Sequence, residues 1–330
     1  MNKYIKGISL HKPSKTSLLR ILGTIISLGL VIWLLSKQGW REIIEAIQLI
    51  PIEVFLISFV FMILSRLAVT ARWHVLLRAA SFRINFGQTL RVTFAGLFAT
   101  NFLPTTIGGD VVRLAGMVRM SYDTTIATAS LIVDRLIGML GMAMALPLAI
   151  PSLIEAGGIN RLLPQTGSSG AVYRSAIVLP IWLHKLWEKS KQILQKLLQA
   201  LSIWLKKPAS LVISLAFTWI HMLCLYGIFY VLLTAMNEEV SFWQIGGLYS
   251  LIYFFTLLPV SINGYGLQEL SITVVFSNLG GVSVGSALTM ALLYRTLMPV
   301  VSLPGAFTLP GVLAGNSEQT QTKTPDTVEQ

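Results

Sequence analysis

A sequence motif that occurs twice constrains the fold of this 330-residue chain more than any other feature. Residues 103–109 read LPTTIGG, and residues 258–264 read LPVSING, 155 positions later. The flanking sequences match in nearly the same register, since Phe-Gly-Gln at 86–88 returns as Phe-Trp-Gln at 242–244. A duplicated half with a Pro/Gly break inside an apolar stretch is typical of the core of membrane transporters. The repeat therefore predicts two related halves, each with one interrupted hairpin.

Composition places the chain in a membrane. It is 54% hydrophobic and only 12% charged, with a mean hydropathy of +0.71, whereas soluble domains carry about a quarter charged residues. The net charge of +11 lies in short segments that flank apolar stretches, as the positive-inside bias predicts. We therefore expect lipid rather than nucleic acid as a partner. The single cysteine, Cys224, can form no internal disulfide.

The basic residues predict the topology of the first half, residues 51–154. The basic N-terminus (1–17) is expected in the cytoplasm, followed by an uncleaved transmembrane helix at 18–35. A second helix from Ile52 returns inward to a run of arginines. The next apolar stretch, 89–103, is short and is followed by Arg113 and Arg119. A re-entrant hairpin keeps these arginines inside, and broken backbone at membrane depth is tolerated where protein or water surrounds it.

The remaining segments complete the predicted topology. A long helix at 124–154 crosses outward, and the loop 155–170 is external. Whether 171–183 spans the membrane on the way back stays open. Residues 184–207 read as a basic amphipathic helix on the cytoplasmic surface, linking the halves. Their apolar positions recur at helical spacing.

The second half, residues 208–313, has no Lys or Arg between Pro208 and Tyr294. Its first helix, 211–235, is therefore expected to cross outward and to place the second hairpin, 244–279, on the external side. A last helix at 284–313 returns inward, so the C-terminus is cytoplasmic, and the polar tail 314–330 is expected to be disordered. The fold class predicted is all-α: a single polytopic domain over 18–313, with an inverted repeat and two re-entrant hairpins.

Cysteine labelling tests this topology. Single cysteines placed at positions 110 and 264, in a Cys224→Ser background, are expected to react with a membrane-impermeant maleimide from opposite sides. Reaction from one side only would contradict the inversion.

Ionisable residues inside apolar segments are costly and mark candidate sites. Asp110 and Arg113 lie three residues apart and could pair on one helix face. The neighbours Asp134 and Arg135 point about 100° apart on a helix, so they need different partners. In one interpretation, arginines facing a central cavity bind an anionic head group through their planar donor forks, with carboxylates as counter-charges. In the other, the same residues form structural ion pairs that hold the hairpins. The residues concerned are Arg113, Arg135, Arg295, Asp110, Asp134 and Glu269.

The two breaks have chemistry of their own. Glycine permits close backbone approach or positive φ, and proline ends helices, whose free amides attract anions. These residues could equally serve only as hairpin turns. They are Pro104, Gly108, Gly109, Pro259, Gly264 and Gly266.

Catalytic chemistry is sparse. The histidines at 11, 74, 184 and 221 lack metal-ligand spacing, and Gly108-Gly109 is not followed by the Lys-Ser/Thr of a P-loop. We expect no enzyme activity, no metal and no cofactor, although Asp110 and Asp134 could form a carboxylate pair.

Three motifs resemble a known family. Residues 101–113 (NFLPTTIGGDVVR), 130–135 (SLIVDR) and 259–269 (PVSINGYGLQE) are similar to signatures of the transmembrane region of lysylphosphatidylglycerol synthases, also called the flippase-like domain family. The resemblance covers about residues 18–313. It implies a polytopic core that moves or binds anionic or polyprenyl-phosphate-linked lipids.

The chain departs from the family in two respects. Full-length synthases carry a soluble C-terminal aminoacyltransferase domain, whereas only a short polar segment follows residue 313 here, so we expect no aminoacyl transfer. Asn263 and Gln268 stand where the family pattern suggests Gly and Arg, which affects head-group specificity.

The leading hypothesis is a lipid translocase of the inner cell membrane that moves a phosphate-bearing head group. The alternatives are an accessory subunit or enzyme of membrane lipid or glycan transfer, working with a membrane-bound or cytoplasmic transferase, and a lipid-binding scaffold that does not transport.

Overall fold

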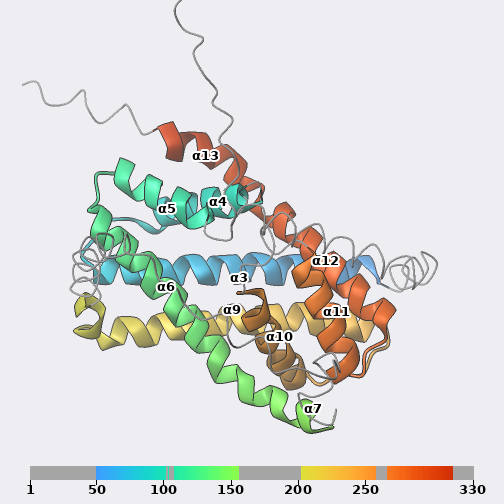
Figure 1. Cartoon of the computed structure of the whole chain (residues 1–330). Helices are drawn as coiled ribbons and strands as arrows, with labels where there is room; N and C mark the ends of the chain where they lie inside the picture. Colours follow the sequence, from blue (N-terminus) through green and yellow to red (C-terminus); the bar gives the residue numbers. More distant parts are fainter. Residues whose placement is uncertain (1–49, 102, 104–107, 156–201, 258–265, 315–330) are drawn as a thin grey trace, which may run out of the picture.

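The computed structural model describes residues 50–101, 103, 108–155, 202–257 and 266–314, and all of the regular structure in these ranges is helical (Figure 1). The predicted all-α polytopic fold is confirmed, because four of the described helices are long and apolar enough to cross a membrane: Ile52–Ala79, Thr124–Glu155, Pro208–Ala235 and Val284–Ser302. The elements of the first half are α3 (Ile52–Ala79), α4 (Phe86–Thr100), α5 (Gly108–Arg119), α6 (Thr124–Ala145), η1 (Leu146–Ala149) and α7 (Ile150–Glu155). Those of the second half are α9 (Pro208–Ala235), α10 (Phe242–Thr256), α11 (Leu267–Leu279), α12 (Val284–Ser302) and α13 (Pro304–Ala314).

Several predictions lie outside the described residues. They concern the first helix at 18–35, the loop 156–170, the segment 171–183, most of the amphipathic helix and the tail from 315 onward. Pro104, Pro259 and Gly264 also lie outside them. Of the amphipathic helix, the last turn is described, and Trp204 is buried there with its indole Nε1 donating to the carbonyl of Leu76 at 2.9 Å.

The sequence repeat is a structural repeat. Helices α3 and α9 both have 28 residues and start 156 positions apart, and α4 and α10 both have 15 residues at the same offset. The matching Phe-x-Gln segments begin α4 and α10. Asn85 caps the first by accepting from the backbone N–H of Gln88, and Ser241 caps the second by accepting from that of Gln244. Such caps satisfy amides left free in the first turn of a helix, so the repeated sequence specifies where each hairpin begins.

The long helices α3 and α9 pack against each other in opposite directions (Figure 1). Near the middle, Ser65 Oγ and His221 Nδ1 are 2.7 Å apart, and these two residues are repeat equivalents. At one end, the Nζ of Lys207 donates to the carbonyl of Ala79 at 2.6 Å, so the start of α9 meets the end of α3. A residue that contacts its own equivalent lies on the symmetry axis. The two halves are therefore inverted about a pseudo-two-fold axis that passes between Ser65 and His221.

Glycine allows the first hairpin to close. Helices α4 and α5 run antiparallel, and a Cβ at Gly109 would lie 2.7 Å from the carbonyl oxygen of Gly96. A Cβ at Gly96 would likewise lie 2.7 Å from the carbonyl oxygen of Gly109. In the second hairpin, Gly266 precedes α11 with φ of 77°, a conformation that glycine adopts without a steric penalty.

The structure differs from the sequence expectation in the last helix of each half. The segment 284–313 is two helices, α12 and α13, divided at Leu303 before Pro304. The segment 124–154 contains the 3₁₀ turn η1 with Pro147. Proline lacks a backbone N–H and clashes with the preceding turn, so it ends or bends a helix. In consequence α13 folds against α4 and η1 against α10.

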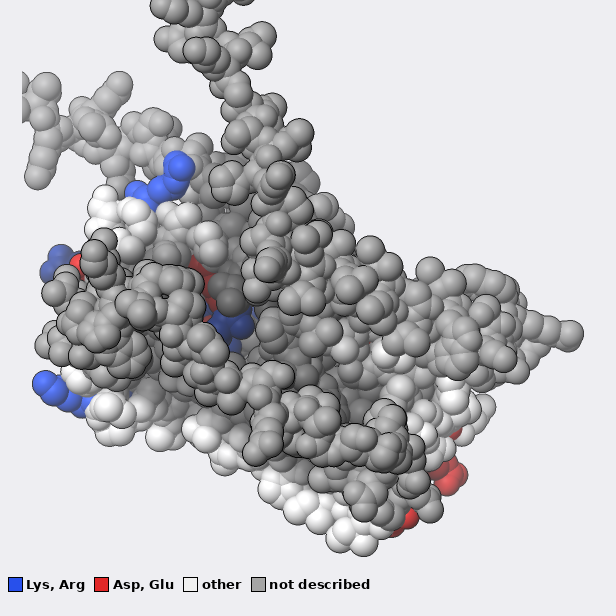
Figure 2. Space-filling model, in the orientation of Figure 1, with Lys and Arg blue, Asp and Glu red and all other residues white. Residues whose placement is uncertain are grey.

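Charge separates along the molecule. Basic residues lie where α3 and α5 end and α9 begins, and acidic residues lie near the start of α3, at the end of α7 and beyond the end of α9. Figure 2 shows blue residues toward the left and in the centre, and red residues mainly at the lower right, with smaller red areas in the centre and at the left. Hairpin α4–α5 follows α3 at the basic end, whereas α10–α11 follows α9 at the acidic end.

Replacement of Gly109 by alanine tests the close approach within the first hairpin. The added methyl group meets backbone that cannot move aside cheaply, so Gly109→Ala is expected to cost about 1–3 kcal/mol of stability. Gly311→Ala is the control, because a Cβ there meets nothing within 4 Å and alanine favours the helix by up to about 1 kcal/mol. Thermal unfolding in detergent measures both, and equal melting temperatures would contradict the packing.

Candidate functional site

A buried chain of ion pairs joins the helices of the first half. The carboxylate of Asp134 on α6 accepts from Arg72 Nε at 2.7 Å and from Arg113 NH2 at 3.2 Å. Arg113 also contacts Asp110 at 3.1 Å through its NH1, one helical turn away on α5. Asp110 in turn pairs with Arg135 Nε. The expected pairing of Asp110 with Arg113 forms, and Asp134 and Arg135 do bind different partners.

Arg113 lies within this chain of charges rather than in a cavity. Its guanidinium carbon is 4.0 Å from the ring centroid of Trp73, and the residue is 8% exposed. Trp73 Nε1 donates to Ser130 Oγ at 3.1 Å, which fixes the ring beneath the cation. Breaking a buried pair leaves an uncompensated charge, which is strongly destabilising. Arg113 and Asp134 therefore hold α3, α5 and α6 together.

Within the described residues, the second half has one equivalent of these buried ion pairs. Arg295 Nε on α12 lies 3.3 Å from Glu269 Oε1 on α11, and its NH1 donates to Gln268 Oε1 at 2.9 Å. The pair is the repeat equivalent of Arg135 with Asp110, at offsets of 160 and 159 residues. In each half, this equivalent ion pair ties the second arm of the hairpin to the helix that follows it. In the first half, Arg113 with Asp134 adds a second tie between the same two helices.

Gln268, which stands where the family pattern suggests arginine, makes a contact that an arginine could not make. Its side-chain oxygen accepts from Arg295, a role that an arginine cannot perform because guanidinium has no acceptor. Gln268 therefore orients Arg295 without adding a second positive charge.

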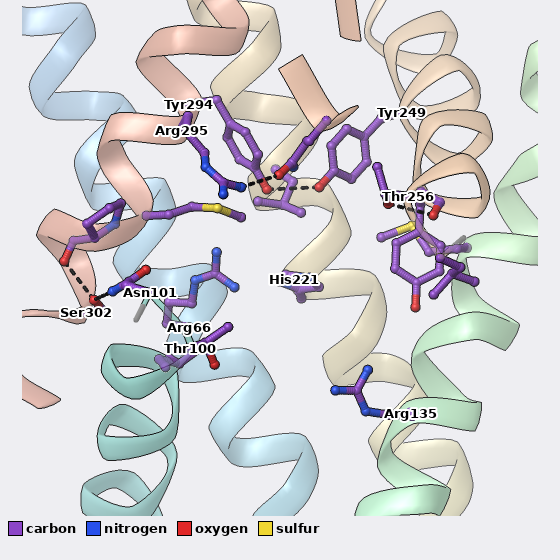
Figure 3. Close-up of a pocket in the computed structure, with 18 residues that line it drawn as sticks. Arg66, Thr100, Asn101, Arg135, His221, Tyr249, Thr256, Tyr294, Arg295 and Ser302 are labelled. Carbon is purple, nitrogen blue, oxygen red and sulfur yellow. Dashed lines mark hydrogen bonds between the residues drawn. The ribbon is translucent and has the colours of Figure 1, made fainter. Parts of the chain in front are cut away.

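A cavity of about 340 Å³ lies at the pseudo-two-fold axis. Arg66 from α3, Arg135 from α6 and Arg295 from α12 line it (Figure 3). His221, whose Nδ1 is bonded to Ser65, reaches it from α9. Polar groups line it further: Thr100, Asn101, Tyr249, Tyr253, Thr256, Gln268, Tyr294 and Ser302.

Hydrogen bonds fix several of these side chains. Tyr249 Oη and Tyr294 Oη are 2.9 Å apart, joining α10 to α12. Asn101 Nδ2 donates to Ser302 Oγ at 2.8 Å, joining the end of α4 to the end of α12 (Figure 3). Both hairpins therefore border the cavity, together with α3, α6, α9 and α12.

Arg66 is the cavity-lining arginine that is not among the site residues expected from the sequence. Within the described part of the chain it forms no ion pair, and its NH2 donates a weak hydrogen bond to Met62 Sδ at 3.4 Å. A partly buried cation with so weak a partner needs an anion or water for compensation. The sequence does contain a signal for it, an arginine inside a strongly apolar helix, but the arginines that follow it on the same helix give it the pattern of a topological charge.

The cavity divides the predicted site residues into two groups. Arg135 and Arg295 line it, whereas Arg113, Asp110, Asp134 and Glu269 lie behind the lining as their partners or as links between helices. Gly108, Gly109 and Gly266 shape the hairpins and do not line the cavity. No group of three metal-ligating side chains occurs in the described ranges.

These features define a class: multi-pass helical membrane proteins built from an inverted repeat around a cationic cavity. The family model of the lysylphosphatidylglycerol synthase TM region matches residues 20–305. The chain belongs to this family, which handles membrane lipids. A search of curated proteins finds no match.

Loss of the Asp134 charge tests its role in holding the helices. Asp134→Asn leaves Arg72 and Arg113 short of a counter-charge and is expected to cost about 3 kcal/mol. Asp123→Asn is the matched control, because Asp123 is exposed and asparagine caps a helix equally well. Unfolding in mixed detergent micelles measures both, and similar losses in the two variants would refute the role.

Proposed function

We propose that this protein translocates the phosphate-bearing head group of a membrane lipid through the central cavity. The observation that carries the proposal is the convergence of Arg66, Arg135 and Arg295 on one cavity at the inversion axis. Guanidinium binds phosphate through parallel N–H donors, and three such groups from three helices can surround one anion.

The size of the cavity supports a head-group site. A volume of about 340 Å³ is at the lower end of ordinary ligand sites, roughly 300–1,000 Å³. A phosphate with a small polar substituent fits such a space, whereas acyl chains do not. The chains would remain in the bilayer while the polar group crosses, which removes the cost of exposing it to hydrocarbon.

Ion-pair exchange supplies a mechanism for alternating access. Arg135 and Arg295 each pair with a carboxylate on the second arm of a hairpin, namely Asp110 on α5 and Glu269 on α11. A phosphate that binds these arginines competes with the carboxylates and weakens the tie between a hairpin and its following helix. The hairpins lie toward opposite ends of the molecule, so movement of one opens the cavity to one side.

The charge distribution indicates which side of the membrane each hairpin faces in this mechanism. The positive-inside bias places the basic end, with the α4–α5 hairpin, in the cytoplasm and the acidic end outside. On the same bias we propose that both termini lie in the cytoplasm, and we propose the inner cell membrane as the location.

Transport should depend on the cavity arginines. A charge-neutral pair of changes, Arg295→Gln with Glu269→Gln, leaves no uncompensated carboxylate and is expected to slow head-group movement at least tenfold. The measurement uses proteoliposomes with fluorescent phosphatidylglycerol and dithionite quenching of the outer leaflet. Arg78→Gln with Glu53→Gln, at exposed positions on α3, is the control and should transport at the wild-type rate.

Arg66 offers a test that breaks no ion pair. Arg66→Gln removes a cation with no carboxylate partner in the described residues, so stability should stay within about 1 kcal/mol while transport falls about tenfold or more. Arg66→Lys keeps the charge without the planar fork and should recover part of the rate. Wild-type transport by a folded Arg66→Gln would remove Arg66 from the proposed site.

Two further measurements, combined with the transport assay, distinguish the alternative functions. Lipid that co-purifies by native mass spectrometry but does not cross the bilayer would indicate a binding scaffold. Product formed by the purified protein from a lipid acceptor and an activated donor would indicate an enzyme.

A further inference from the structure

A second cavity, of about 620 Å³, opens at the basic end of the molecule, separate from the central one. It lies between α4, α5 and α13, and its lining contains three arginines from three places in the chain: Arg83, Arg91 and Arg119. No acidic residue is among its lining residues. We propose that this cavity is a surface site for the phosphate group of an anionic membrane lipid.

The frame around the arginines is fixed by hydrogen bonds. Tyr122 Oη donates to the carbonyl of Arg83 at 2.8 Å, and Thr308 Oγ1 donates to the carbonyl of Arg91 at 3.2 Å. Burial raises the pKa of the Tyr122 phenol, which keeps the hydroxyl protonated as a donor. The backbone is thereby held while the exposed guanidinium groups stay available.

An apolar surface beside the arginines favours a lipid over a soluble phosphate. Phe307 lines the same cavity and is 88% exposed, the highest fraction among the large exposed hydrophobic side chains described. Val312 and Met120 are also part of the lining. A cationic cavity flanked by an exposed aromatic ring suits a molecule with a phosphate at one end and a hydrocarbon chain at the other.

The repeat shows that this charge is not needed to build a hairpin. The second-half equivalents of Arg83, Arg91 and Arg119 are Glu239, Gly247 and Asn278. At Gly247 the space is closed, because a Cβ there would lie 2.7 Å from the carbonyl oxygen of Leu148. The three arginines belong to the first half only, so the two ends of the molecule would treat anionic lipid differently.

The experiment compares two variants that remove the same charge. Arg91→Gln with Arg119→Gln changes the cavity. Arg78→Gln with Lys206→Gln removes two exposed cations at the same end that do not line it. Native mass spectrometry of the full chain, in nanodiscs of phosphatidylcholine with a minor fraction of phosphatidylglycerol, measures retained phosphatidylglycerol. Because the central cavity can hold one phosphatidylglycerol molecule, the quantity compared is the phosphatidylglycerol bound beyond the first molecule. This is expected to fall about tenfold in the first variant and to stay near wild type in the second.

Two further measurements decide whether the bound phosphate belongs to a lipid or to a soluble anion. Phe307→Ala should lower retention of phosphatidylglycerol severalfold, because it removes apolar contact and no charge. Inorganic phosphate at millimolar concentration should not displace the lipid.

Equal retention in the two double variants would overturn the proposal. Displacement by inorganic phosphate would also overturn it, since the site would then serve a soluble anion. The transport assay on the Arg66 variant is independent of this result, because Arg66 lies in the central cavity.

Discussion

The antiparallel contact between α3 and α9 determines the rest of the architecture. Ser65 and His221 are repeat equivalents and touch at 2.7 Å, so the inversion axis passes between them. Each hairpin follows the end of one of these helices and therefore starts from an opposite end of the molecule. Because the axis also runs beside the central cavity, residues from both halves meet there. A duplication in the same orientation would have placed both hairpins at one end.

Burial of charge is the second constraint, and the two halves meet it differently. The first half compensates Arg72 and Arg113 with Asp134, and the second half has the apolar Ile228, Ile272 and the weakly polar Tyr294 at the equivalent positions. Among the ion pairs of the described residues, the pair of Arg135 with Asp110 and its equivalent, Arg295 with Glu269, are common to both. A feature kept in both halves fits the shared action of two hairpins, whereas a feature of one half fits local stability. The asymmetry also leaves Arg66 without a repeat counterpart, since Met222 stands at its equivalent position.

The sequence indicates which charged residues interact inside the membrane more reliably than it indicates what each of them does. It predicts that Asp110 pairs with Arg113, because a spacing of three places both on one helix face, and this contact forms. It predicts that Arg113, Arg135 and Arg295 share a cavity, and two of them line it. Arg113 lies instead over Trp73, which precedes it by forty residues. Such a contact depends on how α3 and α5 pack, and no local pattern reports it. The division of the last helix at Leu303 does have a local cause in the sequence, because Pro304 cannot continue the helix.

The sequence by itself determined the membrane environment, the duplication, the helix starts and the sidedness of charge. These follow from hydrophobicity, capping residues and the position of arginines, which act locally or through the solvent. Only the tertiary structure decided which arginines line the cavity and which lie behind its lining. The side chains concerned lie on helices far apart in the chain, and their distances depend on the packing of α3 against α9 and of each hairpin against its neighbours. The basic cavity at Arg83, Arg91 and Arg119 was decided in the same way, because α13 must fold back over α4 before the three guanidinium groups and Phe307 share one space.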